Sequence, residues 1–195
     1  MAHVLDPVAV ELERILRPHG FRRVAWKYLN SEVSAVVRQI AIEKFRWNAP
    51  GMHRFRLLLK LYLATGAAGE FVFPSLPGRY SLVLEVGDGI FRDDESAFHL
   101  LPPDPADPAF LAGLRAMVEQ DVLPFLDRAT SLEGVVAPLE EASHRAGRDL
   151  HTVPLAIALA RLGRTEESRF QFRRAAGDPE AVRAVAKHHG IDVDN

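Results

Sequence analysis

Basic side chains alternate with large apolar ones over residues 53–63, and this stretch carries the clearest chemistry in the chain. A strand there has Arg54, Arg56, Lys60 and Tyr62 on one face and apolar side chains on the other. Basic groups beside an aromatic ring bind an acidic protein surface, or hold single-stranded nucleic acid through phosphate contacts and base stacking. A solvated sheet face accounts for the same alternation without any ligand.

The preceding apolar stretch, residues 34–45, runs into the segment "EKFRWN" and adds further basic side chains. We expect Arg38 and Lys44 to join the basic sheet face, and Arg46 and Trp47 to form its edge. A Trp at this position packs where the strand leaves the sheet. The predicted binding surface is therefore a basic sheet face with an aromatic edge.

A weaker candidate is a metal site in an acidic loop. Asp93, Asp94 and Glu95 lie close to His99 in the sequence, and hard cations favour oxygen ligands that a loop can bring together. Consecutive carboxylates also repel one another, so an exposed acidic loop is the alternative interpretation. The nearby Gly87-Asp88-Gly89 is explained by a tight turn at a strand end.

Most sequence motifs of catalysis are absent. The chain contains no G-x-S-x-G, H-E-x-x-H, P-loop or G-x-G-x-x-G motif. It contains no cysteine, which excludes disulfides, thiolate nucleophiles and thiolate metal sites. These absences favour a non-enzymatic protein, and we expect no cofactor.

The net charge of −2 hides an asymmetry along the chain. Residues 1–66 carry eleven Lys and Arg against five Asp and Glu, whereas residues 67–163 carry seven against fifteen. A basic first third can face an anionic partner, the acidic middle of its own chain, or a second copy of itself. The interpretation that the chain complements itself is favoured.

Composition also bears on location and origin. No apolar run approaches the roughly 18 to 20 residues that a membrane span needs. The N-terminal residues lack the basic and apolar regions of a signal peptide, so we expect a cytoplasmic protein that does not bind membranes. Arg far outnumbers Lys, which is typical of a GC-rich bacterial genome.

The spacing of apolar residues predicts one helix followed by four strands. The helix covers residues 7–18, and the strands cover 21–29, 34–45, 53–63 and 80–86. Consecutive strands with short links indicate an antiparallel sheet, and hence the α+β class. The predicted core is Phe21, Trp26, Ile40, Ile42, Phe55, Leu57, Leu59, Leu61, Leu82 and Leu84.

Helices are predicted from residue 107 onward. Pro124 should kink the first of them, and Gly163 and Gly190 should end later ones. Residues between Leu159 and Phe170 resemble one tetratricopeptide-like unit, but stacked repeats usually need about three units, so a docked helical hairpin is expected. We predict an α+β domain over 1–130 and a helical extension over 131–195 that docks on it.

Several segments together resemble an uncharacterised bacterial family, the domain-of-unknown-function family 4304. They are "LRPHGF" at 16–21, the aromatic residues of 26–28, "IAIEKFRWN" at 40–48 and "VLPFLDR" at 122–128. The family has a Phe-Gln pair where this chain has Ile42-Glu43, so a role of that Gln does not transfer directly. The resemblance implies a small α+β protein without an assigned activity, with an association to immunity and interaction proteins.

Three functions follow as hypotheses. The leading one is a protein–protein interaction module, immunity-like, that binds a protein partner or itself through the basic face or the edge at residues 44–56. The second is a nucleic-acid-binding protein that uses the same Arg and Lys side chains. The third is a small metal-dependent enzyme built on the 93–99 loop.

Overall fold

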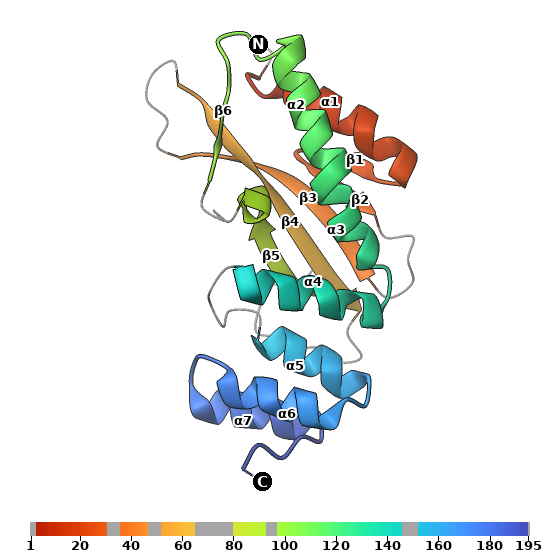
Figure 1. Ribbon diagram of the computed structural model, residues 1–195, viewed down its shortest axis with the longest axis vertical. Coiled ribbons are helices and arrows are strands. Elements are labelled where there is room, and N and C mark those ends of the chain that lie inside the picture. The colour runs from red at the N-terminus through yellow and green to blue at the C-terminus, as the bar shows by residue number, and fades with distance from the viewer. Residues whose placement is uncertain are drawn as a thin grey trace.

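The computed structural model describes residues 3–30, 36–46, 52–64, 80–92, 97–145 and 152–194 (Figure 1). An antiparallel sheet has the order β1-β2-β3-β4-β5, and β6 also pairs with β4. The strands are β1 Arg22–Val24, β2 Lys27–Asn30, β3 Val36–Lys44, β4 Arg54–Ala64, β5 Tyr80–Gly87 and β6 His99–Leu100. The predicted α+β class with an antiparallel sheet is confirmed, with more strands than the four expected.

One predicted strand is in fact a tight hairpin. The stretch 21–29 forms β1 and β2, which are antiparallel partners joined through Ala25 and Trp26. Ala25 has a φ of 56°, in the left-handed region, and this residue reverses the chain. The apolar–polar alternation of the sequence continues through the turn, which is why it indicated a single strand, but the pairing places Tyr28 on the same side as Arg23 and not on that of Val24.

Three helices cover one face of this sheet. They are α1 Asp6–Leu16, α2 Pro108–Met117 and α3 Leu123–Arg128, which lie together in front of the strands in Figure 1. The Tyr28 hydroxyl of β2 donates to the carbonyl of Ala9 in α1 at 2.6 Å, so α1 is fixed to the same face that α3 contacts.

A π-helical turn, η3 Val118–Val122, joins α2 to α3. Pro124 follows it in the first turn of α3, where its missing N–H and its ring cannot continue a regular α-helix. The predicted irregularity at Pro124 therefore takes the form of a widened turn just before the proline.

The remaining helices extend the helical layer beyond the end of the sheet (Figure 1). They are α4 Leu132–Arg145, α5 Thr152–Arg161, α6 Thr165–Arg174 and α7 Pro179–His188. Gly163 and Gly190 both have a φ of 74° and end α5 and α7 as predicted, and the Asp178 carboxylate caps α7 by accepting the Glu180 N–H. The domain division at residue 130 stays a prediction.

The core lies between the sheet and the helices. Eight predicted core residues are buried there: Phe21, Ile40, Ile42, Phe55, Leu57, Leu59, Leu61 and Leu84. Trp26 is only partly buried and packs against the core from the hairpin turn, and its ring is 4.7 Å from that of His3. The side chain of Leu82 lies outside the described residues.

Within the part of the chain that the structure describes, no helix combines the length and the apolar character needed to cross a bilayer.

Candidate functional site

Strand pairing divides the predicted basic face between the two sides of the sheet. Directly paired residues in an antiparallel sheet point to the same side. Arg38 is paired with Leu61, and Lys44 with Phe55, so both belong to the helix-covered side. Arg56 is paired with Glu43 on the opposite side, where both side chains are partly exposed. We call this side the open face, although the residues at its centre are buried. The prediction that Arg38 and Lys44 join Arg54 and Arg56 is therefore wrong.

Arg38 is a structural residue of the core side. It is 5% exposed, and its Nη1 donates to the Asp127 carboxylate at 2.6 Å and to the Leu126 carbonyl at 3.3 Å. Its guanidinium carbon also lies 5.5 Å from the centre of the Phe21 ring. These contacts tie β3 to α3, and they leave Arg38 no surface on which to bind a partner.

On the open face, acidic side chains of the same sheet pair with the central basic residues. Arg56 Nε donates to the Glu43 carboxylate at 2.5 Å, and Lys60 pairs with Glu85 of β5. Each pair joins neighbouring strands and neutralises a positive charge. The open face is thus much less basic than the strand pattern alone suggests.

Tyr62 is buried on this face and does not present an exposed ring. Its hydroxyl lies 3.3 Å from the Gln39 side-chain oxygen, to which it donates a hydrogen bond. Burial, and to a smaller extent the charge of Glu85, raises the pKa of Tyr62 above its ordinary value. Tyr62 is therefore part of the packing of the sheet, whereas it was predicted to contact a ligand.

Aromatic and basic side chains gather at the other end of the open face. We call this set the strand-end cluster: Phe45, Met52, Arg54, Arg56, Phe98 and Leu100. The rings of Phe45 and Phe98 meet edge to face at 4.8 Å. The guanidinium of Arg56 lies 4.9 Å from the centre of the Phe98 ring, and that of Arg54 lies 5.8 Å from the centre of the Phe45 ring.

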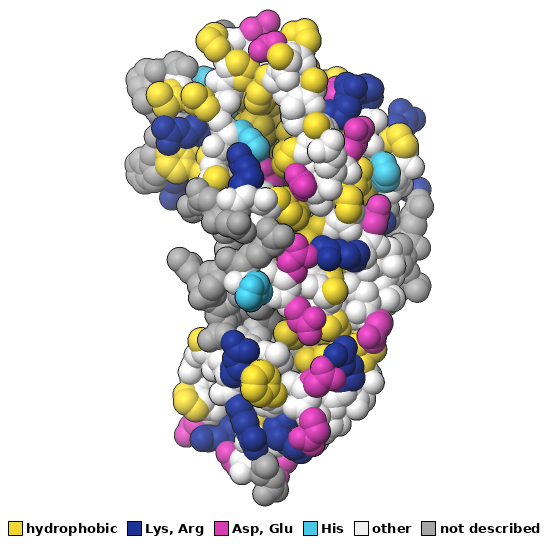
Figure 2. Space-filling model, viewed as in Figure 1, with side chains coloured by type: hydrophobic (Ala, Val, Ile, Leu, Met, Phe, Trp, Pro, Cys, Tyr) yellow, Lys and Arg dark blue, Asp and Glu magenta, His cyan; other side chains and the backbone are white. Residues whose placement is uncertain are grey.

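The short strand β6 completes the cluster. Its pairing places Leu100 opposite Arg54. Phe98, the residue just before β6, lies beside Arg56. Leu100 is 57% exposed and Met52 is 39% exposed, so the apolar part of the cluster faces solvent. In Figure 2 hydrophobic and basic side chains lie together at the upper left, where β6 and the start of β4 are found in Figure 1.

The residues beside the cluster are described only in part. Lys44 and Arg46 are exposed at the end of β3. Trp47, the predicted aromatic edge, lies outside the described residues. Phe45 and Met52 lie within the predicted 44–56 edge. Sequence reasoning missed Phe98 and Leu100, because β6 has only two residues and no alternation to reveal it.

The acidic loop gives no metal site in the described residues. Asp93, Asp94 and Glu95 lie outside them, and His99 contacts Asp88 through its Nε2. Among the residues that are described, no group of three His, Asp or Glu side chains could hold a metal ion. Asp88 is an additional buried acid that the sequence suggested only as part of a turn.

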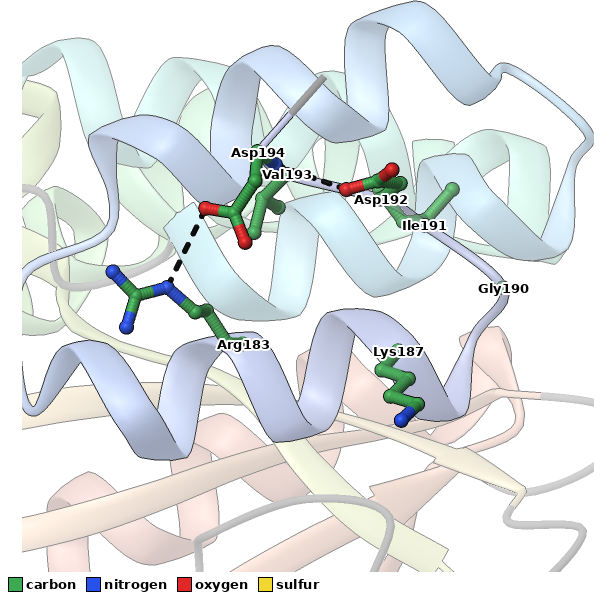
Figure 3. Close-up of a pocket in the computed structure, with 7 residues that line it drawn as sticks. All are labelled: Arg183, Lys187, Gly190, Ile191, Asp192, Val193 and Asp194. Atoms are coloured by element: carbon green, nitrogen blue, oxygen red, sulfur yellow. Dashed lines mark hydrogen bonds and ion pairs between the residues drawn. The ribbon is translucent and has the colours of Figure 1, made fainter.

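A hollow of about 520 Å³ lies between α7 and the segment that follows it (Figure 3). Its lining residues are Arg183, Lys187, Gly190, Ile191, Asp192, Val193 and Asp194. Arg183 Nε lies 3.6 Å from the Asp194 carboxylate, and the Asp194 N–H donates to Asp192. Two cations and two carboxylates balance one another, so the lining favours no single class of charged ligand.

Comparison of the chain with protein-family models, with curated proteins and with solved structures finds no match. The resemblance to family 4304 therefore stays a prediction.

Proposed function

We propose that this chain is a non-enzymatic protein–protein interaction module that binds its partner through the strand-end cluster. The observation that carries the proposal is the exposure of Leu100 and Met52 beside two arginines that stack on phenylalanine rings. Exposed apolar groups next to Arg and aromatic side chains are typical of the energetic centres of protein interfaces.

The partner should present apolar side chains together with carboxylates. Arg54 lies next to the exposed Leu100 and beside the Met52 sulfur at 3.5 Å, so an apolar contact and a charged contact can be made at one point. Arg56 already has Glu43 as a partner, which holds its guanidinium over the Phe98 ring and limits its use for phosphate binding. The cluster thus fits a protein surface better than a nucleic-acid backbone.

Affinity capture from cells that produce the protein tests this proposal. The bait is compared with Leu100→Asp and Arg54→Glu, and with Val10→Asp as the matched control, because Val10 is 61% exposed on α1 away from the cluster. Captures are made with and without nuclease. We expect a protein that survives nuclease and whose recovery falls at least tenfold for the two cluster variants and stays unchanged for the control.

Other outcomes overturn the proposal. Recovery of nucleic acid alone supports the second hypothesis, with Arg54 and Arg56 as its contacts. Equal recovery of a protein with all variants shows that the interface lies outside the cluster. Recovery of neither leaves an enzyme or a small-ligand sensor as the function to pursue.

A further inference from the structure

One edge of β4 is shared by two strands with a gap between them. Gly87, the last residue of β5, is paired with Leu58, and His99 of β6 is paired with Phe55. Between these pairs, the Leu57 N–H donates to Asp88 Oδ1 at 3.0 Å. The carboxylate of Asp88 thus takes the place of a backbone carbonyl at the point where neither strand supplies one.

The second oxygen of the same carboxylate contacts β6. Asp88 Oδ2 is bonded to His99 Nε2, and the Asp88 side chain is completely buried while that of His99 is 18% exposed. A buried carboxylate is costly unless its oxygens are bonded, and here both of them are. Asp88 therefore links the end of β5, the first half of β4 and the start of β6.

Among the described residues, the backbone bonds that hold β6 are short in extent. Both residues of β6 pair with β4, and beyond them the Leu101 N–H donates to the His53 carbonyl at 2.8 Å. The His99 ring lies 5.2 Å from that of Phe55. So short a strand gains little from its own backbone pairing, and its position depends on side-chain contacts.

We propose that Asp88 and His99 are positioning residues for the strand-end cluster, because they hold β6 so that Phe98 and Leu100 face the partner. The effect on binding rests on the proposed function, whereas the effect on β6 does not. Asp88 and His99 touch no partner themselves, and their influence passes through the two residues that flank His99.

Hydrogen exchange of the free protein tests the positioning directly. In His99→Phe, the ring against Phe55 is kept and the bond to Asp88 is lost. We expect the Leu101 amide to exchange at least tenfold faster, while the Leu59 amide in the middle of β4 is unchanged. Unchanged exchange at Leu101 overturns the inference.

Two further variants separate this role from a general loss of stability. Asp88→Ala removes both bonds of the carboxylate, whereas Asp88→Asn keeps an oxygen for the Leu57 N–H and an amide group that can bond a neutral His99 ring. Asn should therefore restore most of the protection of Leu101 that Ala loses. The matched control is Asp104→Ala, whose carboxylate accepts the Ala106 N–H in an exposed turn. It should leave Leu101 unchanged.

The same variants are then used for capture from the lysate. Reduced recovery of the partner by His99→Phe, together with the faster exchange, supports both proposals. Faster exchange with full recovery overturns the strand-end cluster as the binding surface, while the hold of Asp88 on β6 stands. Reduced recovery without any change in exchange overturns the positioning role.

Discussion

At the residue scale, Glu11 shows how one buried acid joins two helices. Its carboxylate on α1 accepts hydrogen bonds from Arg14 at 2.8 Å and from Arg115 of α2 at 2.6 Å. The hydrogen bond from Arg14, with that from Arg115, outweighs burial and lowers the pKa of Glu11 from 4.5 to about 2. Glu11 is thus charged in the folded protein over the whole ordinary range of pH.

This pKa predicts a dependence of stability on pH. The hydrogen bonds of the charged Glu11 stabilise the fold fully above pH 4.5, the ordinary pKa of a Glu side chain. This stabilisation is lost as the pH falls to about 2, the pKa of Glu11 in the folded protein. Glu11→Gln should lower the free energy of unfolding at pH 7 by about 1 to 2 kcal/mol, because the arginines are partly solvated. It should also flatten the fall in stability below pH 4.5. Urea unfolding at pH 7 and at pH 3 measures both effects.

The exposed Glu13 provides the control for this prediction. It pairs with Arg23 on the surface, so Glu13→Gln should change stability by less than about 0.5 kcal/mol at either pH. A Glu11→Gln variant that keeps the full pH dependence would show that other carboxylates govern acid unfolding.

Arg38 shows which residue placements the sequence could not predict. Strand β4 alternates, and that pattern predicted correctly which of its side chains share a face. In β3, the seven residues from Val36 to Ile42 are all buried, so no alternation reveals which of them face the helices. A shift of one residue in register moves every side chain to the other side of the sheet, and the sequence of β3 carries no sign of that register.

At the element scale, the β1–β2 hairpin depends on an unusual residue. Among the described residues, Ala25 is the non-glycine residue with a positive φ. A side chain with a Cβ atom costs about 1 kcal/mol or more in this conformation. The sequence Val-Ala-Trp-Lys contains neither Gly nor Asn, so it lacks the usual signals of a tight turn, and one continuous strand was predicted.

This conformation makes Ala25→Gly a stabilising change. Glycine adopts a positive φ without strain. The free energy gained by removing the strain exceeds the entropy cost of ordering glycine, which is more flexible than alanine in the unfolded chain. We expect the free energy of unfolding to rise by about 0.5 to 1 kcal/mol in urea titrations. Ala175→Gly is the control, since its φ of −62° is ordinary, and it should destabilise the protein. A loss of stability in both variants would contradict the strain at Ala25.

At the scale of the whole molecule, ion pairs inside the fold balance part of the charge asymmetry of the chain. Ion pairs between the basic first third and the acidic middle include Arg38–Asp127 and Lys60–Glu85. Basic and acidic side chains also alternate over the visible face in Figure 2. These contacts agree with the interpretation, favoured from the composition, that the chain complements itself.

This balance predicts weak binding to polyanions. Glu43 and Glu85 neutralise Arg56 and Lys60 on the open face, so replacing both by Lys should expose a basic face. The double variant should bind a fluorescent single-stranded oligonucleotide at least tenfold more tightly than the natural chain at about 50 mM salt, and should lose that gain at about 200 mM.

Fluorescence anisotropy measures this difference, and a second double variant controls for net charge. Glu140→Lys with Glu180→Lys makes the same change of charge at exposed helical positions away from the sheet, and it should bind no better than the natural chain. If instead the natural chain binds the oligonucleotide tightly and with a steep salt dependence, Glu43 and Glu85 do not neutralise the charges of Arg56 and Lys60. The open face would then be a nucleic-acid surface, and the strand-end cluster would act as its stacking platform in place of a protein-binding site.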